Sequence, residues 1–140
     1  MQATRQLAAI MFTDMEGYTA LMEKNEQAAI EQRNRHRQVF EKSMVDHGGK
    51  IIQYYGDGTL SIFSSAIHAV NAGVAMQSLF RQTPQVPLRI GIHIGDINFD
   101  DSGVYGDGVN IASRIESFAV AGSVFISDKV FDEIDRKSVV

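Results

Sequence analysis

The sequence predicts an α+β fold in which a β-sheet is covered by helices on one face, within one domain of 140 residues. Three observations predict it. Strand-like apolar segments alternate with segments of helical periodicity, one central pair of strands flanks a Gly-Asp-Gly turn, and the length suits one compact domain. The expected order is strand, helix, two hairpin strands, helix, strand, helix, strand and helix.

The first half of the chain is interpreted from apolar periodicity and turn residues. Residues 6–15 form an apolar run that predicts a buried strand, and a helical turn follows with Thr19 as its expected N-cap. From about residue 26 to residue 46 apolar side chains recur every three or four positions, which predicts a long helix ending at Gly48 and Gly49. Residues 50–63 predict two strands joined by a turn at residues 56–58.

The second half continues the alternation. Residues 64–82 predict an amphipathic helix capped by Ser64 or Ser65, residues 86–99 alternate like a strand, and residues 100–108 form a polar, glycine-rich loop. A helix over residues 109–119 with Asp107 as its N-cap, a strand over 122–127 and a helix over 128–137 follow. Because no strand follows the last helix, we expect residues 1–140 to be a single domain that lacks its C-terminal strands.

The composition excludes several classes of function. A net charge of −4 gives no electrostatic basis for binding nucleic acid or an anionic membrane. The absence of cysteine excludes disulfides, thiolate nucleophiles and cysteine-ligated zinc. The first residues lack the layout of a signal peptide, and no apolar run approaches membrane-spanning length. We therefore expect a soluble, cytoplasmic protein that contacts neither nucleic acid nor membrane.

Two aspartates lie where strands end. Asp14 closes the first strand, ahead of a loop and a helix start, and Asp57 lies at the tip of the hairpin in the first of two YGDG tetrapeptides. Each position also suits an ordinary turn or cap. If the two strands are neighbours, however, the carboxylates form a site for two Mg²⁺ ions, which can activate an attacking oxygen and hold a leaving phosphate.

The second YGDG tetrapeptide precedes a helix instead of joining two strands. Asn110 and Arg114 follow it four residues apart, so they lie on one face of that helix. An asparagine and a planar guanidinium on one stripe can contact sugar and phosphate. The same pattern also fits a solvated helix face on which Arg114 neighbours Glu116.

Four segments resemble the successive signature segments of class III nucleotidyl cyclases, the adenylate and guanylate cyclase catalytic domains. They are FTDMEGYT, GGKIIQYYGDGTLSIF, LRIGIHIGD and VYGDGVNIASRIE, and the resemblance runs from Ile10 to about Ser127. It implies a ferredoxin-like βαββαβ sheet. It also implies an enzyme that converts a nucleoside triphosphate into a cyclic nucleotide and pyrophosphate, using two Mg²⁺ or Mn²⁺ ions per site.

The resemblance also assigns residues to roles. Asp14, Asp57 and the backbone carbonyl of Met15 match the metal ligands, and Asn110 and Arg114 match the catalytic pair that orients the ribose and stabilises the transition state. In this family the active form is a head-to-tail dimer, so one subunit of a homodimer would supply the aspartates and its partner the catalytic pair. The positions matched to substrate binding are Phe12, Thr13, Glu16, Gly17, Tyr18, Thr19, Gln53, Gly56, Arg89 and Gly103.

Two positions depart from the family pattern for reading the base. Gln53 stands where adenylate cyclases usually carry lysine, and Gly103 stands where the partner usually supplies Asp or Thr. A slip of one or two residues would bring Asp101 or Ser102 to that place instead. ATP is favoured over GTP because the family resemblance favours it and the residues that read guanine are absent as well. A phosphate-binding lysine that family members carry further along would lie beyond residue 140.

Two alternatives remain open at this point. The chain could be a catalytically weak cyclase-like module that binds nucleotide or dimerises to regulate an attached domain. A diguanylate cyclase is a third interpretation, but it would require a Gly-Gly-Asp/Glu-Glu-Phe hairpin, and this hairpin reads Gly-Asp-Gly.

Overall fold

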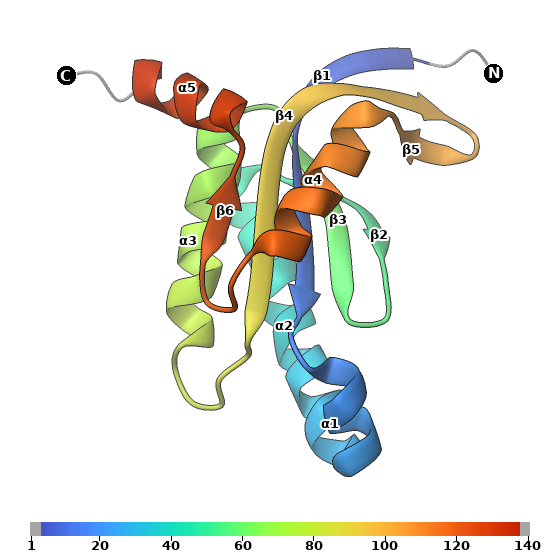
Figure 1. Ribbon diagram of the computed structural model, residues 1–140, viewed down its shortest axis with the longest axis vertical. Coiled ribbons are helices and arrows are strands. Elements are labelled where there is room, and N and C mark those ends of the chain that lie inside the picture. Colours follow the sequence, from blue (N-terminus) through green and yellow to red (C-terminus); the bar gives the residue numbers. More distant parts are fainter. Residues whose placement is uncertain (1–3, 138–140) are drawn as a thin grey trace.

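The protein, seen in a computed structural model, is described for residues 4–137, which form a six-stranded sheet and five helices (Figure 1). The elements are β1 (Thr4–Met15), α1 (Tyr18–Lys24), α2 (Glu26–His47), β2 (Lys50–Tyr54), β3 (Gly58–Phe63), α3 (Ala66–Phe80), β4 (Leu88–Asp100), β5 (Gly103–Tyr105), α4 (Asp107–Phe118), β6 (Val124–Ile126) and α5 (Asp128–Lys137). The predicted α+β fold and the order of its main elements are confirmed.

The sheet is built around β1 and β4. Its order is β2-β3-β1-β4-β5, every neighbouring pair in that path is antiparallel, and β6 pairs in parallel with β4 at Ile90–Ile92. β5 pairs with the far end of β4, at residues 98–100. The loop predicted over residues 100–108 therefore contains a short edge strand. The pattern of apolar residues could not predict this strand, because Val104 is its only aliphatic residue.

Helices cover both faces of the sheet. The larger core lies between one face and helices α2, α3 and α5, and it includes Ala9 and Met11 of β1. The smaller core lies on the opposite face, where Ala112 of α4 packs with Ala8 and Ile10. Helix α4 crosses this second face in Figure 1. The expectation of helices on one face thus holds for three of the helices that contact the sheet but not for α4, because both sides of β1 are apolar and both need cover.

Helix starts differ in detail from the predictions. The N-cap of α1 is Gly17, with φ of 73°, and Thr19 lies inside the helix. The N-cap of α4 is Gly106, so Asp107 is the first helical residue and not the cap. Ser65 is the N-cap residue of α3, as expected, although its side chain makes no capping hydrogen bond. The end of α2 at Gly48 is confirmed.

No helix within residues 4–137 combines the length and the apolar character needed to cross a lipid bilayer.

Candidate active site

The pairing of β1 with β3 brings Asp14 and Asp57 to one place. Asp14 is the Cα partner of Gly58, the residue after Asp57. The Met15 N–H donates a hydrogen bond to the Asp57 carbonyl at 2.9 Å, and the Tyr55 N–H closes the hairpin turn on the Gly58 carbonyl at 2.9 Å. The adjacency on which the two-aspartate hypothesis depended is therefore present.

Gly58 permits this close approach. A Cβ atom at Gly58 would lie 2.2 Å from the Thr13 carbonyl oxygen, so any side chain would push the hairpin away from β1. The glycine after Asp57 consequently serves strand packing as well as the turn.

The Asp14 carboxyl lies in a charged and partly buried environment. Its side chain is 26% exposed and accepts a hydrogen bond from Arg89 Nη2 at 2.5 Å. The pKa of Asp14 is raised from 3.8 to about 6, because burial and the neighbouring Asp57 raise it by more than the Arg89 contact lowers it. Two carboxylates that disfavour each other's charge are suited to share a divalent cation, which prefers oxygen ligands.

The donor set fits such an ion. The Met15 side chain is buried, so only its backbone could contribute to a site. Within residues 4–137 no three His, Asp or Glu side chains converge as a metal-binding group. A cation here would therefore rely on the two aspartates, backbone oxygen and oxygens of a substrate.

A hollow of about 390 Å³ opens beside the two aspartates. Helix α4 forms one wall of it with Val109, Asn110, Ser113 and Glu116, so Asn110 lies at the same hollow as the aspartates of its own chain. The remaining lining residues are Phe12, Thr13, Asp14, Tyr55, Asp57 and Gly58. The Thr13 hydroxyl is turned to the other face of β1, where it bonds to Thr59 and His36.

Arg114 does not line this hollow. Its side chain is exposed, and its guanidinium makes no hydrogen bond or ion pair with any other described residue. Asn110 is exposed as well. The two residues predicted as a pair on one helix face are thus both accessible from outside the chain.

Glu116 is not on a solvated helix face beside Arg114, which was one interpretation of the sequence. It is only 9% exposed, and its Oε2 lies 3.4 Å from Nε of Arg89. The pKa of Glu116 is raised from 4.5 to about 7, chiefly by burial and next by the charge of Asp14, while Arg89 opposes the rise. Arg89 therefore lies between two carboxylates, Asp14 and Glu116.

The other predicted substrate-binding residues lie around this centre without lining the hollow. Glu16, Gly17 and Thr19 are exposed at the turn into α1, and the Tyr18 hydroxyl accepts a hydrogen bond from Arg33 of α2 at 3.3 Å. Gly56 is exposed in the hairpin turn.

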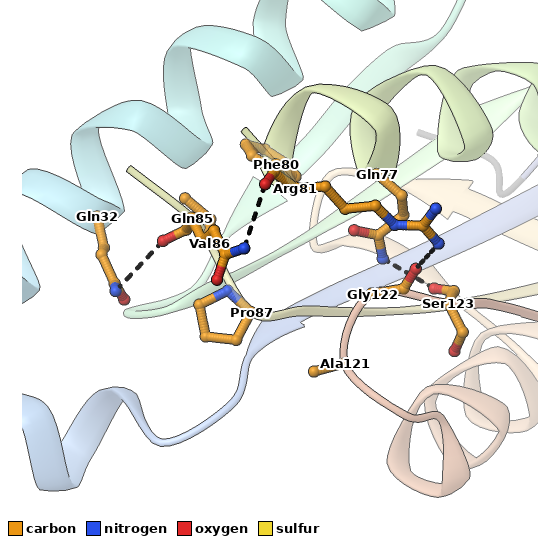
Figure 2. Close-up of a pocket in the computed structure, with 10 residues that line it drawn as sticks. All are labelled: Gln32, Gln77, Phe80, Arg81, Gln85, Val86, Pro87, Ala121, Gly122 and Ser123. Carbon is orange, nitrogen blue, oxygen red and sulfur yellow. Dashed lines mark hydrogen bonds between the residues drawn. The ribbon is translucent and has the colours of Figure 1, made fainter. Parts of the chain in front are cut away.

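A larger hollow, of about 620 Å³, lies at the end of α3 (Figure 2). Its polar side chains hold loops in place: Gln77 donates to the carbonyls of Leu88 and Ser123, and Arg81 donates to that of Gly122. No carboxylate or histidine lines it. Its size alone therefore does not make it the reactive site.

The comparisons with known proteins agree with the geometry. The family model of the adenylate and guanylate cyclase catalytic domain matches residues 1–139. The chain belongs to this family. A Rhizobium meliloti (strain 1021) protein provisionally named adenylate cyclase 3 is 38% identical over 96% of this chain, which spans only 24% of that relative.

Solved cyclase structures share the fold of this cyclase domain. The adenylate/guanylate cyclase/hydrolase from Silicibacter pomeroyi is 35% identical with a TM-score of 0.88, over 99% of this chain and 84% of that one. The adenylyl cyclase CyaB from P. aeruginosa is 26% identical with a TM-score of 0.86, over 97% of this chain and 84% of that one.

The two expected base-reading positions of the cyclase domain lie on opposite edges of its sheet. Gln53 is exposed on β2, beside a register shift in the β2–β3 ladder, and Gly103 begins β5. Gly103 has φ of 122°, a conformation that a side chain rarely adopts. Ser102 instead hydrogen-bonds to Asp100 through its N–H and its hydroxyl, while Asp101 is exposed.

Sequence reasoning missed five residues that line the hollow, and three of these carry polar side chains: Tyr55, Ser113 and Glu116. Tyr55 stacks on Phe12 with ring centroids 6.1 Å apart, so two aromatic rings flank the aspartates. Tyr55 could have been predicted as a site residue from its position next to the hairpin turn. The signal for Ser113 and Glu116 was their position on the same helix as Asn110.

Proposed function

We propose that the domain converts ATP into 3′,5′-cyclic AMP and pyrophosphate at sites formed between two copies of the chain arranged head to tail. The observation that carries the proposal is the β1–β3 register, which sets Asp14 beside Asp57, with the Met15 N–H donating a hydrogen bond to the Asp57 carbonyl. Family membership and the adenylate cyclase names of relatives support ATP.

In this proposal Asp14, Asp57 and the Met15 carbonyl hold two Mg²⁺ or Mn²⁺ ions. When bound, the ions lower the pKa of the ribose 3′-hydroxyl and neutralise the pyrophosphate. The 3′-oxygen forms a bond to the α-phosphorus, the bond from that phosphorus to the pyrophosphate oxygen breaks, and the hydroxyl proton leaves to solvent. No protein nucleophile is required.

The remaining roles belong to side chains. Arg114 of one subunit neutralises charge that develops at the α-phosphate, and Asn110 orients the ribose. Loss of one such donor typically costs about 10²–10³ in rate. The exposure of Arg114, without a partner among the described residues, supports a role toward a group outside its own chain.

The positions of Gln53 and Gly103 support a site between subunits. Strands β3, β1 and β4 separate β2 from β5 in the sheet. One base therefore cannot contact both positions of the same chain, whereas two chains arranged head to tail can present one position each.

Two alternatives follow from the same residues. Gln53 can donate and accept hydrogen bonds and so suits either purine, which leaves GTP as the alternative substrate. Gly103 offers no side chain to the base, which favours the second alternative, a weakly catalytic module that binds nucleotide and regulates an attached domain.

The test is product formation by the purified protein with ATP or GTP and with Mg²⁺ or Mn²⁺, followed by chromatography. The proposal expects cyclic AMP, which disappears in Asp57→Asn and persists in Asp46→Asn, an exposed aspartate paired with Lys42 on α2. Cyclic GMP as the main product would assign the enzyme to GTP. Absence of product under every condition would favour the regulatory module.

A further inference from the structure

Helix α4 meets strand β4 at Gly91, where Glu116 lies directly over the strand. A Cβ atom at Gly91 would come within 2.3 Å of the Glu116 backbone nitrogen. Only a glycine lets the helix backbone approach this closely, so Gly91 fixes the position of Glu116.

Arg89 lies two residues before Gly91 and therefore on the same face of β4. Its Nη2 contacts Asp14 at 2.5 Å, while its Nε faces Glu116 Oε2 at 3.4 Å. Both Nε and Oε2 are buried and lack a hydrogen bond within the described residues. The contact is thus an ion pair whose geometry does not make a hydrogen bond.

We infer that Glu116 is a positioning residue. It holds the Arg89 guanidinium by an ion pair when Asp14 releases Arg89 and binds a divalent cation. The inference rests on the proposed function, because it assumes that Asp14 is a metal ligand. It adds a role for a residue of α4 that acts through Arg89 and not on the substrate.

The physical reason is competition for one carboxylate. Asp14 cannot hold both the Arg89 guanidinium and a cation in full, and a part-buried guanidinium left without a counter-charge is destabilising. Glu116 is already within ion-pair distance and has an unused oxygen. Glu16 also attracts Arg89, but it is exposed to solvent and so offers a screened charge.

Glu116 does not itself complete a metal site. Across the described part of the chain, no three potential ligand side chains converge on one point. A direct ligand and a positioning residue also differ in a measurable way, because only the positioning residue depends on Arg89.

The experiment is a double-mutant cycle between Glu116→Gln and Arg89→Gln, in the full chain. Mn²⁺ binding is measured by electron paramagnetic resonance in the presence of 3′-deoxy-ATP, which lacks the attacking hydroxyl, with Mn²⁺ bound by the nucleotide alone subtracted. Thermal unfolding verifies that each variant is folded. Glu23→Gln, an exposed glutamate on α1, is the matched control.

Glu116→Gln is expected to weaken Mn²⁺ binding roughly tenfold when Arg89 is present and less than twofold when Arg89 is Gln. Glu116→Asp, which keeps the charge on a shorter side chain, should fall between wild type and Glu116→Gln, and it serves if the glutamine variant does not fold. An equal effect in both backgrounds, or none in either, would overturn the inference.

The Asp57→Asn variant distinguishes a failure of the inference about Glu116 from a failure of the proposed function. If Asp57→Asn abolishes Mn²⁺ binding while Glu116→Gln leaves it unchanged, only the inference is wrong. If Asp57→Asn has no effect, the metal site itself is wrong, and both proposals are overturned.

Discussion

Arg89 donates a hydrogen bond to the Asp14 carboxylate at 2.5 Å, and the two residues are Cα partners in the β1–β4 ladder. Their contact is therefore set by strand register and not by a mobile loop. It connects the residue expected to touch phosphate with the first expected metal ligand, so nucleotide and cation binding should be coupled through this pair.

Replacement of Arg89 by glutamine should change the two binding steps in opposite directions. The KM for ATP is expected to rise about tenfold because a charge-assisted phosphate contact is lost. The Mn²⁺ concentration for half-maximal rate is expected to fall a few-fold, since Arg89 no longer competes for Asp14. Initial rates over a grid of ATP and Mn²⁺ concentrations measure both.

Arg5 provides the matched control for that substitution. It forms an ion pair with Asp96 across the same two strands but is 72% exposed. Arg5→Gln should leave both constants unchanged. If Arg89→Gln changes neither the KM for ATP nor the Mn²⁺ concentration for half-maximal rate, Arg89 does not act at the site.

Gly58→Ala should destabilise the protein through the β1–β3 contact. The added methyl group would meet the Thr13 carbonyl at 2.2 Å, and overpacking of this kind costs about 1–3 kcal/mol of unfolding free energy. Gly56→Ala is the control, because nothing lies within 4 Å of a Cβ there, and its stability should stay within about 0.5 kcal/mol. Urea unfolding followed by circular dichroism distinguishes the two, and equal stabilities would contradict the steric argument.

The sequence predicted the strand that carries Asp14 and the hairpin whose turn carries Asp57, but not the adjacency of the two aspartates. That pairing joins residues more than forty positions apart, and it depends on Gly58 meeting the Thr13 carbonyl across the ladder. Local periodicity contains no information on such a partner. The hairpin and the helix ends at glycines could be predicted because their signals are local.

The burial of Glu116 also could not be predicted from local sequence. Glu116 follows the exposed Arg114 by two residues on the helix, so its position fits a solvated face. In the structure, Gly91 on strand β4 allows the helix to pack closely against the sheet, and this close packing buries Glu116. The burial of a charged residue is decided here by a glycine elsewhere in the chain. Similarly, one-sided helix packing failed for α4 because apolar residues on both sides of β1 require cover.

His36 should make the stability of the fold depend on pH. It is 1% exposed, and its Nε2 lies 3.2 Å from the Thr13 hydroxyl, behind the strand that carries Asp14. Burial lowers the pKa of His36 from 6.5 to about 4, with a smaller contribution from Arg37. The unfolded chain therefore binds a proton between these values that the folded chain does not.

Stability should consequently fall as pH drops from about 6.5 to about 4, by about 3 kcal/mol for this group alone. Above pH 6.5 the contribution is constant. Urea unfolding at pH 7, 6 and 5 should show that His36→Gln has a smaller loss than wild type over this range. His68→Gln, at an exposed histidine on α3, should keep the wild-type slope, and parallel curves for all three proteins would refute the assignment to His36.

The strongest test of the dimer is complementation between two inactive variants. Asp57→Asn should lose the metal site, and Arg114→Ala should lose about 10²–10³ in rate with stability unchanged, because the Arg114 side chain is exposed. If each site combines Asp57 of one chain with Arg114 of the other, an equal mixture forms mixed dimers that contain one intact site. Statistical assembly then restores about a quarter of wild-type activity.

The single chain offers a competing arrangement, because Asn110 lines the same hollow as Asp14 and Asp57 of its own subunit. A site completed within one chain would gain nothing from mixing, since every chain in the mixture lacks either Asp57 or Arg114. The mixture should be assayed after joint refolding, with Asp57→Asn mixed with Asp14→Asn as the control. That control lacks an intact aspartate pair in every chain, so recovery in the first mixture alone would establish sites shared between subunits.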